Sequence, residues 1–242
     1  MTGATSGIGR ATALALADDG WWVLASGRDS ARGGDVAAEL GERGEFAAME
    51  LTEADAPSAL VERATGDGRS LGLLVNNAAI HFLGSLDELA DDDYERLMDV
   101  NVGAAVRLAR EALKTMLAAG DGGVIINVAS EAGMYAIPDQ VAYNVSKAAL
   151  IMLTKAIATD HARDGIRAIS ICPGTTLTPL VERAIASADD PAAHRKQLES
   201  SRPLGRLGTP EEIAAAITFA ASESASFITG TELVIDGGFT AT

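Results

Sequence analysis

Short runs of apolar residues alternate along the chain with longer segments whose apolar residues recur at helical spacing. Such runs predict strands covered on both faces, because buried strands lose the polar–apolar alternation of exposed ones. The predicted strands are Trp22–Ser26, Glu45–Leu51, Leu71–Asn76, Gly123–Ala129, Ala168–Cys172 and Glu232–Ile235. The predicted helices lie at about Ile8–Asp19, Ala31–Arg43, Ala54–Thr65, Asp91–Ala119, Val141–Arg163 and Pro210–Ala221. This alternation predicts an α/β fold, a doubly wound parallel sheet in a single domain over residues 1–242.

One segment breaks the alternation. Residues 179–207 are polar, carry charges of both signs and precede the helix predicted at Pro210. Long excursions from a compact domain are often lids or binding loops. We therefore expect a substrate lid at about 179–207, with a mobile surface insertion as the alternative.

The composition narrows the range of partners. The chain carries a formal net charge of −15, which disfavours nucleic acid and anionic membrane surfaces as partners. Its single cysteine, Cys172, excludes an internal disulfide and suits the reducing cytoplasm. We expect no stretch long and apolar enough to span a bilayer, and no His, Cys and carboxylate cluster with metal-ligand spacing.

Small and polar residues follow most of the predicted strands, at the edge where open α/β sheets bind ligands. A glycine-rich turn, residues 3–9, also opens the first helix, where free backbone N–H groups favour phosphate. The positions after the strands are Gly27-Arg28, Glu50-Leu51-Thr52, Asn76-Asn77-Ala78-Ala79, Ser130, Pro173-Gly174 and Thr178. Their shared placement predicts a ligand site along this edge.

Tyr143 and Lys147 are spaced to share one face of a predicted helix. A phenol with its ordinary pKa of about 10 is a poor acid or base at neutral pH. A positive charge about 4 Å away is worth about 4 kcal/mol at an effective dielectric near 20, enough to lower that pKa by about three units. The spacing therefore predicts that Lys147 makes Tyr143 a proton-transfer group, with a solvated surface pair as the alternative.

These motifs together resemble those of the short-chain dehydrogenase/reductase family, in order and spacing and over essentially the whole chain. They are Thr2-Gly3-x-x-x-Gly7-Ile8-Gly9, Asn76-Asn77-Ala78, Asn101, Ser130, Tyr143-x-x-x-Lys147, Pro173-Gly174 and Thr178. The resemblance implies a Rossmann-like fold and an oxidoreductase that interconverts a ketone and a secondary alcohol by hydride transfer. Acyl-thioester ketones, steroids, sugars and small ketones all remain open as substrates.

The resemblance also implies roles for individual residues. Tyr143 would exchange a proton with the substrate oxygen, and Ser130 would orient that oxygen. Lys147 would lower the pKa of Tyr143 and hold the nicotinamide ribose, and Asn101 would anchor a water in a proton relay. The implied cofactor-binding residues are Gly3, Ser6, Gly7, Ile8, Gly9, Arg28, Glu50, Leu51, Asn77, Ala78, Tyr143, Lys147, Pro173, Gly174, Thr176 and Thr178. The residues expected to line the substrate pocket are His81, Glu131, Met134 and Gln140.

Arg28 bears on the choice of cofactor. An acidic residue at the end of the preceding strand would bind the adenine-ribose hydroxyls and repel a 2′-phosphate. Gly27 stands at that place and Arg28 follows it, so we expect NADP(H) to be preferred, with NAD(H) possible. Ser6 is neutral where many NADP-preferring relatives carry a second base. The alternative is an NAD-dependent alcohol, steroid or sugar dehydrogenase.

The chain also departs from the family pattern. Ala79 replaces the usual glycine, and Glu50 replaces the usual aspartate beside the adenine. Met1 directly precedes Thr2, so the family's first strand is missing from this chain. That strand is central, and its loss would expose two unpaired strand edges. We expect the natural protein to begin several residues earlier. The alternative of another class is a cofactor-binding but non-catalytic, or truncated, protein.

The resemblance further implies a homotetramer. Its interfaces would be formed by the helices predicted at Asp91–Ala119 and Val141–Arg163 and by the C-terminal strand.

Overall fold

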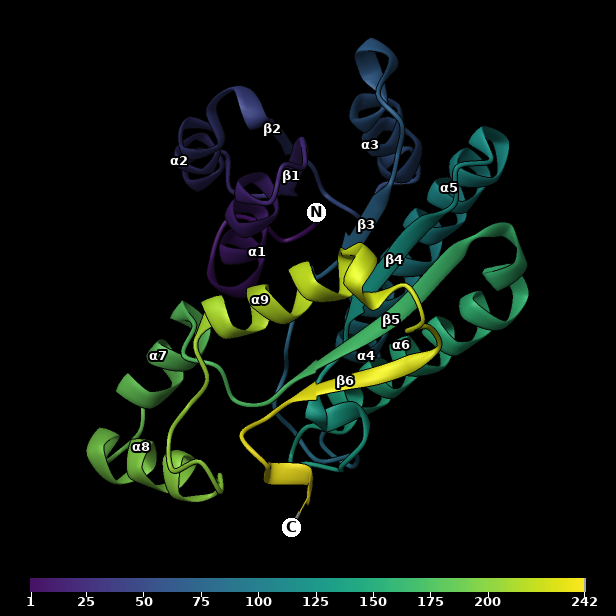
Figure 1. Ribbon diagram of the computed structural model, residues 1–242. Helices are drawn as coiled ribbons and strands as arrows, with labels where there is room; N and C mark the ends of the chain where they lie inside the picture. Colours follow the sequence, from purple (N-terminus) through teal and green to yellow (C-terminus); the bar gives the residue numbers. More distant parts are fainter. Residues whose placement is uncertain (242) are drawn as a thin grey trace.

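The computed structural model describes residues 1–241, which form parallel strands with helices on both sides (Figure 1). The strands are β1 (Val23–Gly27), β2 (Gly44–Ala48), β3 (Leu73–Asn76), β4 (Gly123–Val128), β5 (Ile166–Pro173) and β6 (Thr231–Ile235). β1 pairs with β2, and the other strands pair in the order β3-β4-β5-β6. All of these pairs are parallel. The predicted α/β fold with a parallel sheet is confirmed, and each predicted strand overlaps an observed one.

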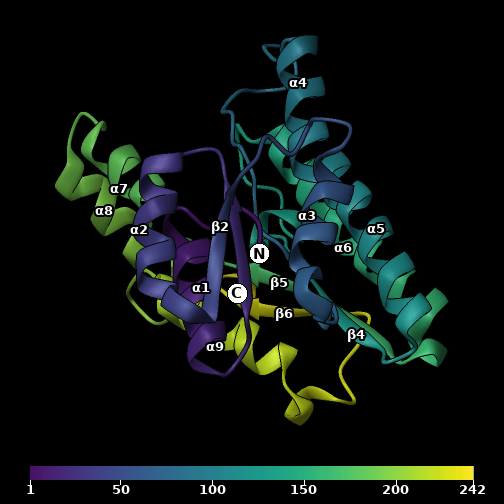
Figure 2. The ribbon, with the colours of Figure 1, turned by 90° about the horizontal axis from the view of Figure 1, so that it is seen from above.

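Helices cover both faces of the strands, and others lie beyond the strand ends (Figures 1 and 2). The helices are α1 (Gly7–Asp18), α2 (Ser30–Leu40), α3 (Ala56–Ala64), α4 (Asp91–Met98), α5 (Ala104–Ala119), α6 (Val141–His161), α7 (Pro179–Ala186), α8 (Pro191–Ser200) and α9 (Pro210–Ala221). Figure 2 shows α1, α2 and α9 on one side and α3, α5 and α6 on the other. Successive strand residues point to opposite faces. Ile126 of β4 accordingly packs with Leu16 and Ile213, whereas its neighbour Ile125 packs with Leu108.

The long helix predicted at Asp91–Ala119 is interrupted. Between α4 and α5 the residues Asp99–Gly103 form a π-helical turn. Such turns insert an extra residue into an α-helix and often occur at functional sites. Asn101, a predicted site residue, lies within this turn and is 1% exposed.

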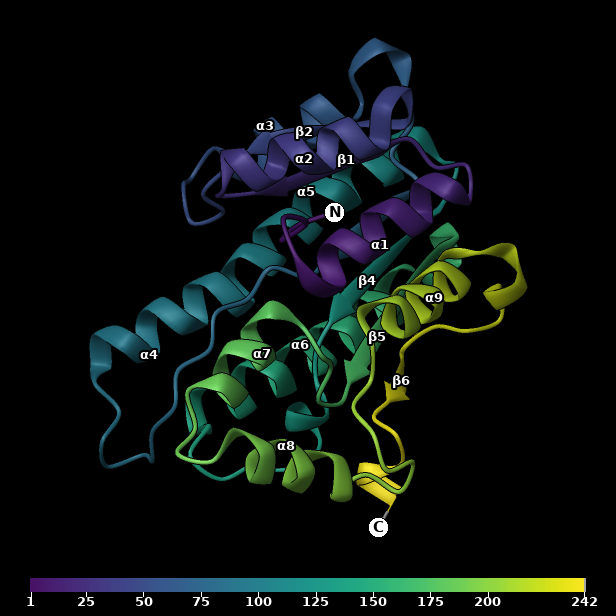
Figure 3. The ribbon, with the colours of Figure 1, turned by 90° about the vertical axis from the view of Figure 1, so that its left-hand side faces the viewer.

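The segment at 179–207 contains two helices that the sequence patterns did not predict. Thr178 and Asp190 cap α7 and α8, and each cap is followed by a proline at the first helical position. This cap-and-proline sequence is a helix start signal. Figures 1 and 3 show α7 and α8 beyond the carboxyl ends of β5 and β6, where a lid would lie.

Residues Met1–Ala4 lie between β1 and β3. The N–H of Ser26 donates to the Met1 carbonyl at 2.9 Å, and the N–H of Thr2 donates to the Val75 carbonyl at 3.1 Å. These bonds reach only the carboxyl halves of β1 and β3, which do not pair with each other in the described residues. The chain thus supplies only a short link at the place where a central strand is expected.

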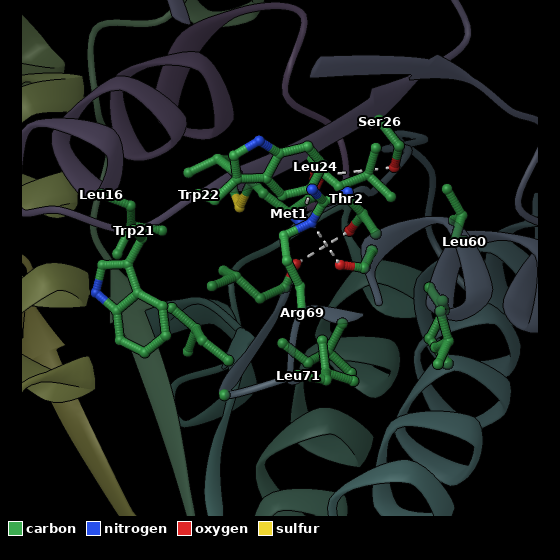
Figure 4. A pocket seen from close by; sticks show the side chains of 18 of the residues that line it. Met1, Thr2, Leu16, Trp21, Trp22, Leu24, Ser26, Leu60, Arg69 and Leu71 are labelled. Carbon is green, nitrogen blue, oxygen red and sulfur yellow. Dashed lines mark hydrogen bonds between the residues drawn. The ribbon is translucent and has the colours of Figure 1, made fainter. Parts of the chain in front are cut away.

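A cavity of about 260 Å³ opens between the amino halves of β1 and β3 (Figure 4). Trp21, Trp22 and Leu71 are among its lining residues, and the Arg69 guanidinium lies 3.7 Å from the ring centre of Trp22. The amino group of Met1 donates to the Leu24 carbonyl at 2.9 Å, and burial lowers its pKa to about 6. The expected unpaired strand edges therefore border an apolar cavity.

One helical stretch corrects an expectation about membranes. Val141–Asp164, which comprises α6 and the turn after it, is long and apolar enough to cross a bilayer by length and composition. About 44% of its most apolar stretch is buried inside the protein, and it packs against β4 and β5. We therefore describe α6 as a core helix.

Candidate active site

Ser130 lies directly after β4, where the chain enters a 3₁₀ turn at Glu131–Gly133. It forms a hydrogen bond with the side chain of Tyr143, and its Oγ accepts from the Ala132 N–H at 3.1 Å. A Cβ on Gly133 would lie 2.7 Å from the carbonyl carbon of Lys147. Glycine at this position therefore lets the Ser130 turn approach the helix that carries Tyr143 and Lys147.

The pKa of Tyr143 does not follow the sequence-based expectation. Burial raises it to about 12, opposed by the hydrogen bond with Ser130 and reinforced by the negative charge of Glu131. The Lys147 ammonium lies 5.4 Å from the centre of the Tyr143 ring. Desolvation of the phenolate therefore outweighs the neighbouring positive charge.

Lys147 is held inside the protein at the carboxyl end of β4. Its side chain is 2% exposed, and its Nζ donates to the Val128 carbonyl at 2.8 Å. Burial lowers the pKa of Lys147 to about 8. This ammonium can therefore lose its proton within about a unit of neutral pH.

Asn101 joins the π-helical turn to the segment after β3 and to α6. Its Oδ1 accepts from the Ile80 N–H at 2.8 Å, and its Nδ2 donates to the Ile80 carbonyl at 3.0 Å. The same Nδ2 donates to Ser146 Oγ at 3.1 Å, and Ser146 Oγ donates to the Tyr143 carbonyl at 2.8 Å. The Asn101 amide thus connects the backbone at Ile80 to the backbone at Tyr143, and the water relay stays a prediction.

The glycine-rich turn packs tightly and leaves the start of α1 accessible to a ligand. A Cβ on Gly9 would lie 2.1 Å from the Gly3 carbonyl oxygen, and a Cβ on Gly7 would lie 3.0 Å from a Thr178 methyl group. Ser6 makes no side-chain capping bond, and the first turn of α1 has no acidic residue. Free N–H groups without a competing carboxylate suit a phosphate, so these residues fit the implied dinucleotide.

Arg28 is one of the residues that line a second cavity, of about 470 Å³. Its side chain is 60% exposed and pairs with Glu50 at 3.6 Å. A Cβ on the preceding Gly27 would lie 2.7 Å from the Thr5 methyl carbon, so a larger residue there would require the Thr5 side chain to move. The cavity is lined by Arg28, Glu50, Thr52, Asp92, Glu95, Arg96, Asp99 and Val100.

The residues expected around the substrate differ in their surroundings. The His81 ring contacts the Tyr143 ring edge-on at 4.8 Å, Met134 is exposed and Gln140 is half-buried. Glu131 is 2% exposed, and Arg202 binds both of its carboxylate oxygens. The Glu131 carboxylate is thus bound inside the protein, and its place in the substrate pocket stays a prediction.

The other predicted cofactor residues gather near the same edge. Thr2 Oγ1 accepts from the N–H groups of Asn77 and Ala78 at 3.0 and 3.1 Å, which fixes the turn after β3. Thr176 Oγ1 donates to the Gly174 carbonyl at 2.9 Å. The remaining positions are Ile8 in α1, Leu51 after β2, Pro173 at the end of β5 and Thr178 as the cap of α7. Within residues 1–241, no group of His, Cys, Asp and Glu side chains could hold a metal ion.

Sequence reasoning missed two residues that organise this site. Ser146 lies three positions after Tyr143, on the same helical face, and this spacing could have identified it. Arg202 lies 71 positions from its partner Glu131. No local pattern could have joined those two residues.

A glycine-rich turn that opens a helix at the carboxyl edge of a parallel sheet is the dinucleotide-binding arrangement. A tyrosine beside a lysine and a serine can move a proton at a hydroxyl or carbonyl oxygen. Fold and site together define the class: an oxidoreductase with a Rossmann-like NAD(P)-binding fold.

Comparison with known proteins gives the family. Residues 3–240 match the family described as enoyl-(acyl carrier protein) reductase. The chain is 40% identical over 259 residues to a 3beta-hydroxysteroid dehydrogenase of Mediterraneibacter gnavus, covering 99% of this chain and 93% of that protein. It is 38% identical over 246 residues to a cis-4-hydroxycyclohexanecarboxylate dehydrogenase of Sinomonas cyclohexanicum, covering 100% and 95%.

A solved structure agrees with these relatives. The crystal structure of a short-chain type dehydrogenase/reductase from Mycobacterium marinum superposes with a TM-score of 0.91 at 34% identity, covering 100% of this chain and 94% of that one. The chain belongs to the short-chain dehydrogenase/reductase family and is an oxidoreductase that acts on CH–OH groups.

Proposed function

We propose that this protein is an NADP(H)-dependent oxidoreductase that interconverts a ketone and a secondary alcohol, with Tyr143 as the general acid and base. The observation that carries the proposal is the convergence of Ser130, Tyr143 and Lys147 at the carboxyl end of β4, with Asn101 and Ser146 bracing the helix beneath Tyr143. The nicotinamide cofactor, when bound, supplies or accepts the hydride.

Tyr143 and Ser130 then have different roles in the transfer of the proton. In carbonyl reduction Tyr143 donates its proton to the substrate oxygen while Ser130 donates a hydrogen bond to the same oxygen. A phenol with a pKa of about 12 is protonated at neutral pH, which suits the reductive direction. In alcohol oxidation Tyr143 must accept a proton, so oxidation is expected to be favoured by alkaline pH.

The proposed substrates are ketones and secondary alcohols carried on a ring. Support comes from the relatives named above, whose names describe a hydroxysteroid and a hydroxycyclohexanecarboxylate dehydrogenase. His81 supplies an aromatic surface beside Tyr143, and Met134 is an exposed apolar side chain at the end of the turn after Ser130. A 3-oxoacyl-thioester reductase is the alternative within the same reaction class.

Arg28 supports NADP(H), because a guanidinium can bind a 2′-phosphate and Gly27 carries no carboxylate that would repel it. A specific observation favours NAD(H) as the second candidate. The cavity beside Arg28 is lined by more carboxylates than guanidiniums, and Glu50 already pairs with Arg28. Local negative charge of this kind repels a phosphate.

A fluorescence titration of the purified protein with NADPH and with NADH decides between the cofactors. We expect NADPH to bind more tightly, and Arg28→Ala to weaken NADPH about tenfold while leaving NADH nearly unchanged. Arg32→Ala, which removes an exposed guanidinium paired with Asp29, is the matched control. Equal affinity of the wild type for both cofactors would refute the NADP preference.

Turnover is tested by a screen of cyclic ketones, steroid ketones and 3-oxoacyl thioesters with the preferred reduced cofactor. Tyr143→Phe removes the hydroxyl and should abolish turnover without preventing cofactor binding. Undiminished turnover by this variant would refute the proposed mechanism.

Assembly and location belong to the same proposal. Exposed apolar residues on α5 and α6, among them Val106, Leu117, Val145 and Met152, support a helical interface in a homotetramer. Sedimentation of the purified protein tests this assembly, and a monomer would contradict it. The lone, buried Cys172 is compatible with a cytoplasmic location.

A further inference from the structure

Glu131 and Arg202 form a buried ion pair directly beside Ser130. Arg202 Nη1 lies 2.5 Å from Glu131 Oε2 and Nη2 lies 2.8 Å from Oε1, which is a bidentate arrangement. Glu131 is 2% exposed and Arg202 is 6% exposed. Bidentate pairs fix the relative orientation of the two side chains as well as their separation.

Arg202 contacts three segments that are distant from one another in the sequence. It lies between α8 and α9, within the 179–207 segment, and its Nη2 also donates to Thr175 Oγ1 after β5. Its guanidinium lies 4.1 Å from the ring centre of Phe239, and that ring contacts Tyr135 edge-on at 5.4 Å. One side chain thus contacts the Ser130 turn, the end of β5 and the C-terminal turn.

The surrounding fold is shaped to admit this pair. A Cβ on Gly174 would lie 2.9 Å from Glu131 Oε2 and 2.6 Å from the Asp236 Cα, so only glycine fits there without displacement. The Asp236 carboxylate accepts from the N–H groups of Gly238 and Thr240, each at 2.8 Å. It therefore holds the turn that carries Phe239.

A buried ion pair is weak evidence for a role in stability, because desolvation offsets much of its attraction. The position of this ion pair beside the proposed catalytic residues suggests a role in the reaction instead. The groups that face Tyr143 are Ser130, Glu131, Lys147 and His81. Glu131 in turn faces Arg202 and Asp236. An unpaired Glu131 would thus place a negative charge beside the proposed acid and leave the Ser130 turn without its anchor.

We propose that Glu131 and Arg202 form a latch that fastens the 179–207 segment to the Ser130 turn, and that both are positioning residues for the reaction. The proposal rests on the proposed function for its kinetic consequences, but the latch itself is a property of the protein without substrate. Releasing it frees the end of the segment from the Ser130 turn and loosens the placement of Ser130 relative to Tyr143.

The first test is limited trypsin digestion of the purified protein, which needs neither substrate nor turnover. Arg183, Arg195 and Lys196 are cleavage sites within α7 and α8. We expect Arg202→Met to raise the cleavage rate at these sites about fivefold or more, by local opening. Arg206→Met is the matched control, because Arg206 pairs with Glu212 at 2.6 Å in the same segment but is exposed. Equal cleavage of the two variants would overturn the latch.

The second test uses Glu131→Gln, which keeps the shape of the side chain and remains informative if Arg202→Met fails to fold. Loss of the carboxylate charge is expected to shift the pH of half-maximal alcohol oxidation downward by about half a unit or more. A purely structural role would leave this pH unchanged, and an unchanged profile would overturn the positioning role.

Kinetics complete the assignment. Arg202→Met is expected to lower kcat/KM about tenfold or more, with NADPH affinity within about twofold of the wild type. Arg202→Lys should restore part of the activity, because an ammonium keeps the charge but loses the bidentate contact. Failure of the wild type to turn over any substrate would refute the proposed function, and the digestion would still decide the latch.

Discussion

Asn101 and Ser146 are joined by a hydrogen bond of 3.1 Å between Asn101 Nδ2 and Ser146 Oγ. Through it the π-helical turn is tied to the first turns of α6, on which Tyr143 lies. Asn101→Leu would leave the Ile80 N–H and carbonyl and the Ser146 hydroxyl without this partner. We expect the free energy of unfolding to fall by about 3 kcal/mol, since each buried unsatisfied group costs about 1–3 kcal/mol. Urea denaturation measures this change, and Ser85→Ala, which removes an exposed bond to Glu88, should have no effect.

Lys147 is expected to reduce stability at neutral pH. Its pKa of about 8 lies below the ordinary value of 10.5, so between these values the unfolded chain binds more protons than the folded protein. The Lys147 contribution to the unfolding free energy therefore rises with pH from about 8 to 10.5, and its penalty is fully present below pH 8.

Lys147→Met should thus stabilise the protein at pH 7 by about 2 kcal/mol, after allowing for the lost bond to the Val128 carbonyl. The difference from the wild type should shrink as the pH approaches 10.5, while activity is lost at every pH. The pKa values of Tyr143 and Cys172 are also shifted, so they too make stability depend on pH. Their contributions are present in both proteins, so the difference between the wild type and the variant in denaturation across this range reports the contribution of Lys147 alone. A constant difference would contradict the assignment.

Gly133 and Gly34 offer a matched pair of alanine substitutions. Gly133→Ala would place a methyl group 2.7 Å from the Lys147 carbonyl carbon, forcing the Ser130 turn away from α6. We expect a loss of about 1–3 kcal/mol in stability and a fall in kcat. Gly34, inside α2, has no atom within 4 Å of its added Cβ, so Gly34→Ala should stabilise the protein by about 0.5–1 kcal/mol. Thermal unfolding and steady-state kinetics of both variants check this contrast.

The cavity between β1 and β3 should accept an added strand. Extending the chain ahead of Met1 by about four apolar, β-branched residues would supply backbone partners for the amino halves of both strands and fill apolar space. We expect the unfolding free energy to rise by about 2–4 kcal/mol, from the burial of two or so large side chains. The amides of Leu24 and Leu73, which face the gap between β1 and β3, should also exchange more slowly with solvent. A glycine–serine extension of equal length is the control, and equal stability of the two proteins would contradict the prediction.

The strands and most helices could be predicted because each buries a continuous apolar run or stripe. The helices α7 and α8 could not be found in this way, since neither contains a buried residue that would give it an apolar stripe. The positions of Ser130, Tyr143 and Lys147 followed from the pattern, but the pKa of Tyr143 depends on the burial of the phenol and on the nearby charge of Glu131. Both quantities are set by tertiary packing. The pairing of Glu131 with Arg202 is likewise set by the fold.

The π-helical turn at Asp99–Gly103 also fixes the rotational phase of α4. Successive residues of an α-helix are rotated by about 100° from one another around the helix axis. Deleting one residue from this turn would restore a regular helix and rotate α4 by that angle, which would carry the fully buried Leu97 away from its packing site. The single extra residue in this turn therefore determines which face of α4 is buried while Asn101 keeps its position in the site. Genetic changes in length are consequently expected to be tolerated at the loops of this protein and not within this turn.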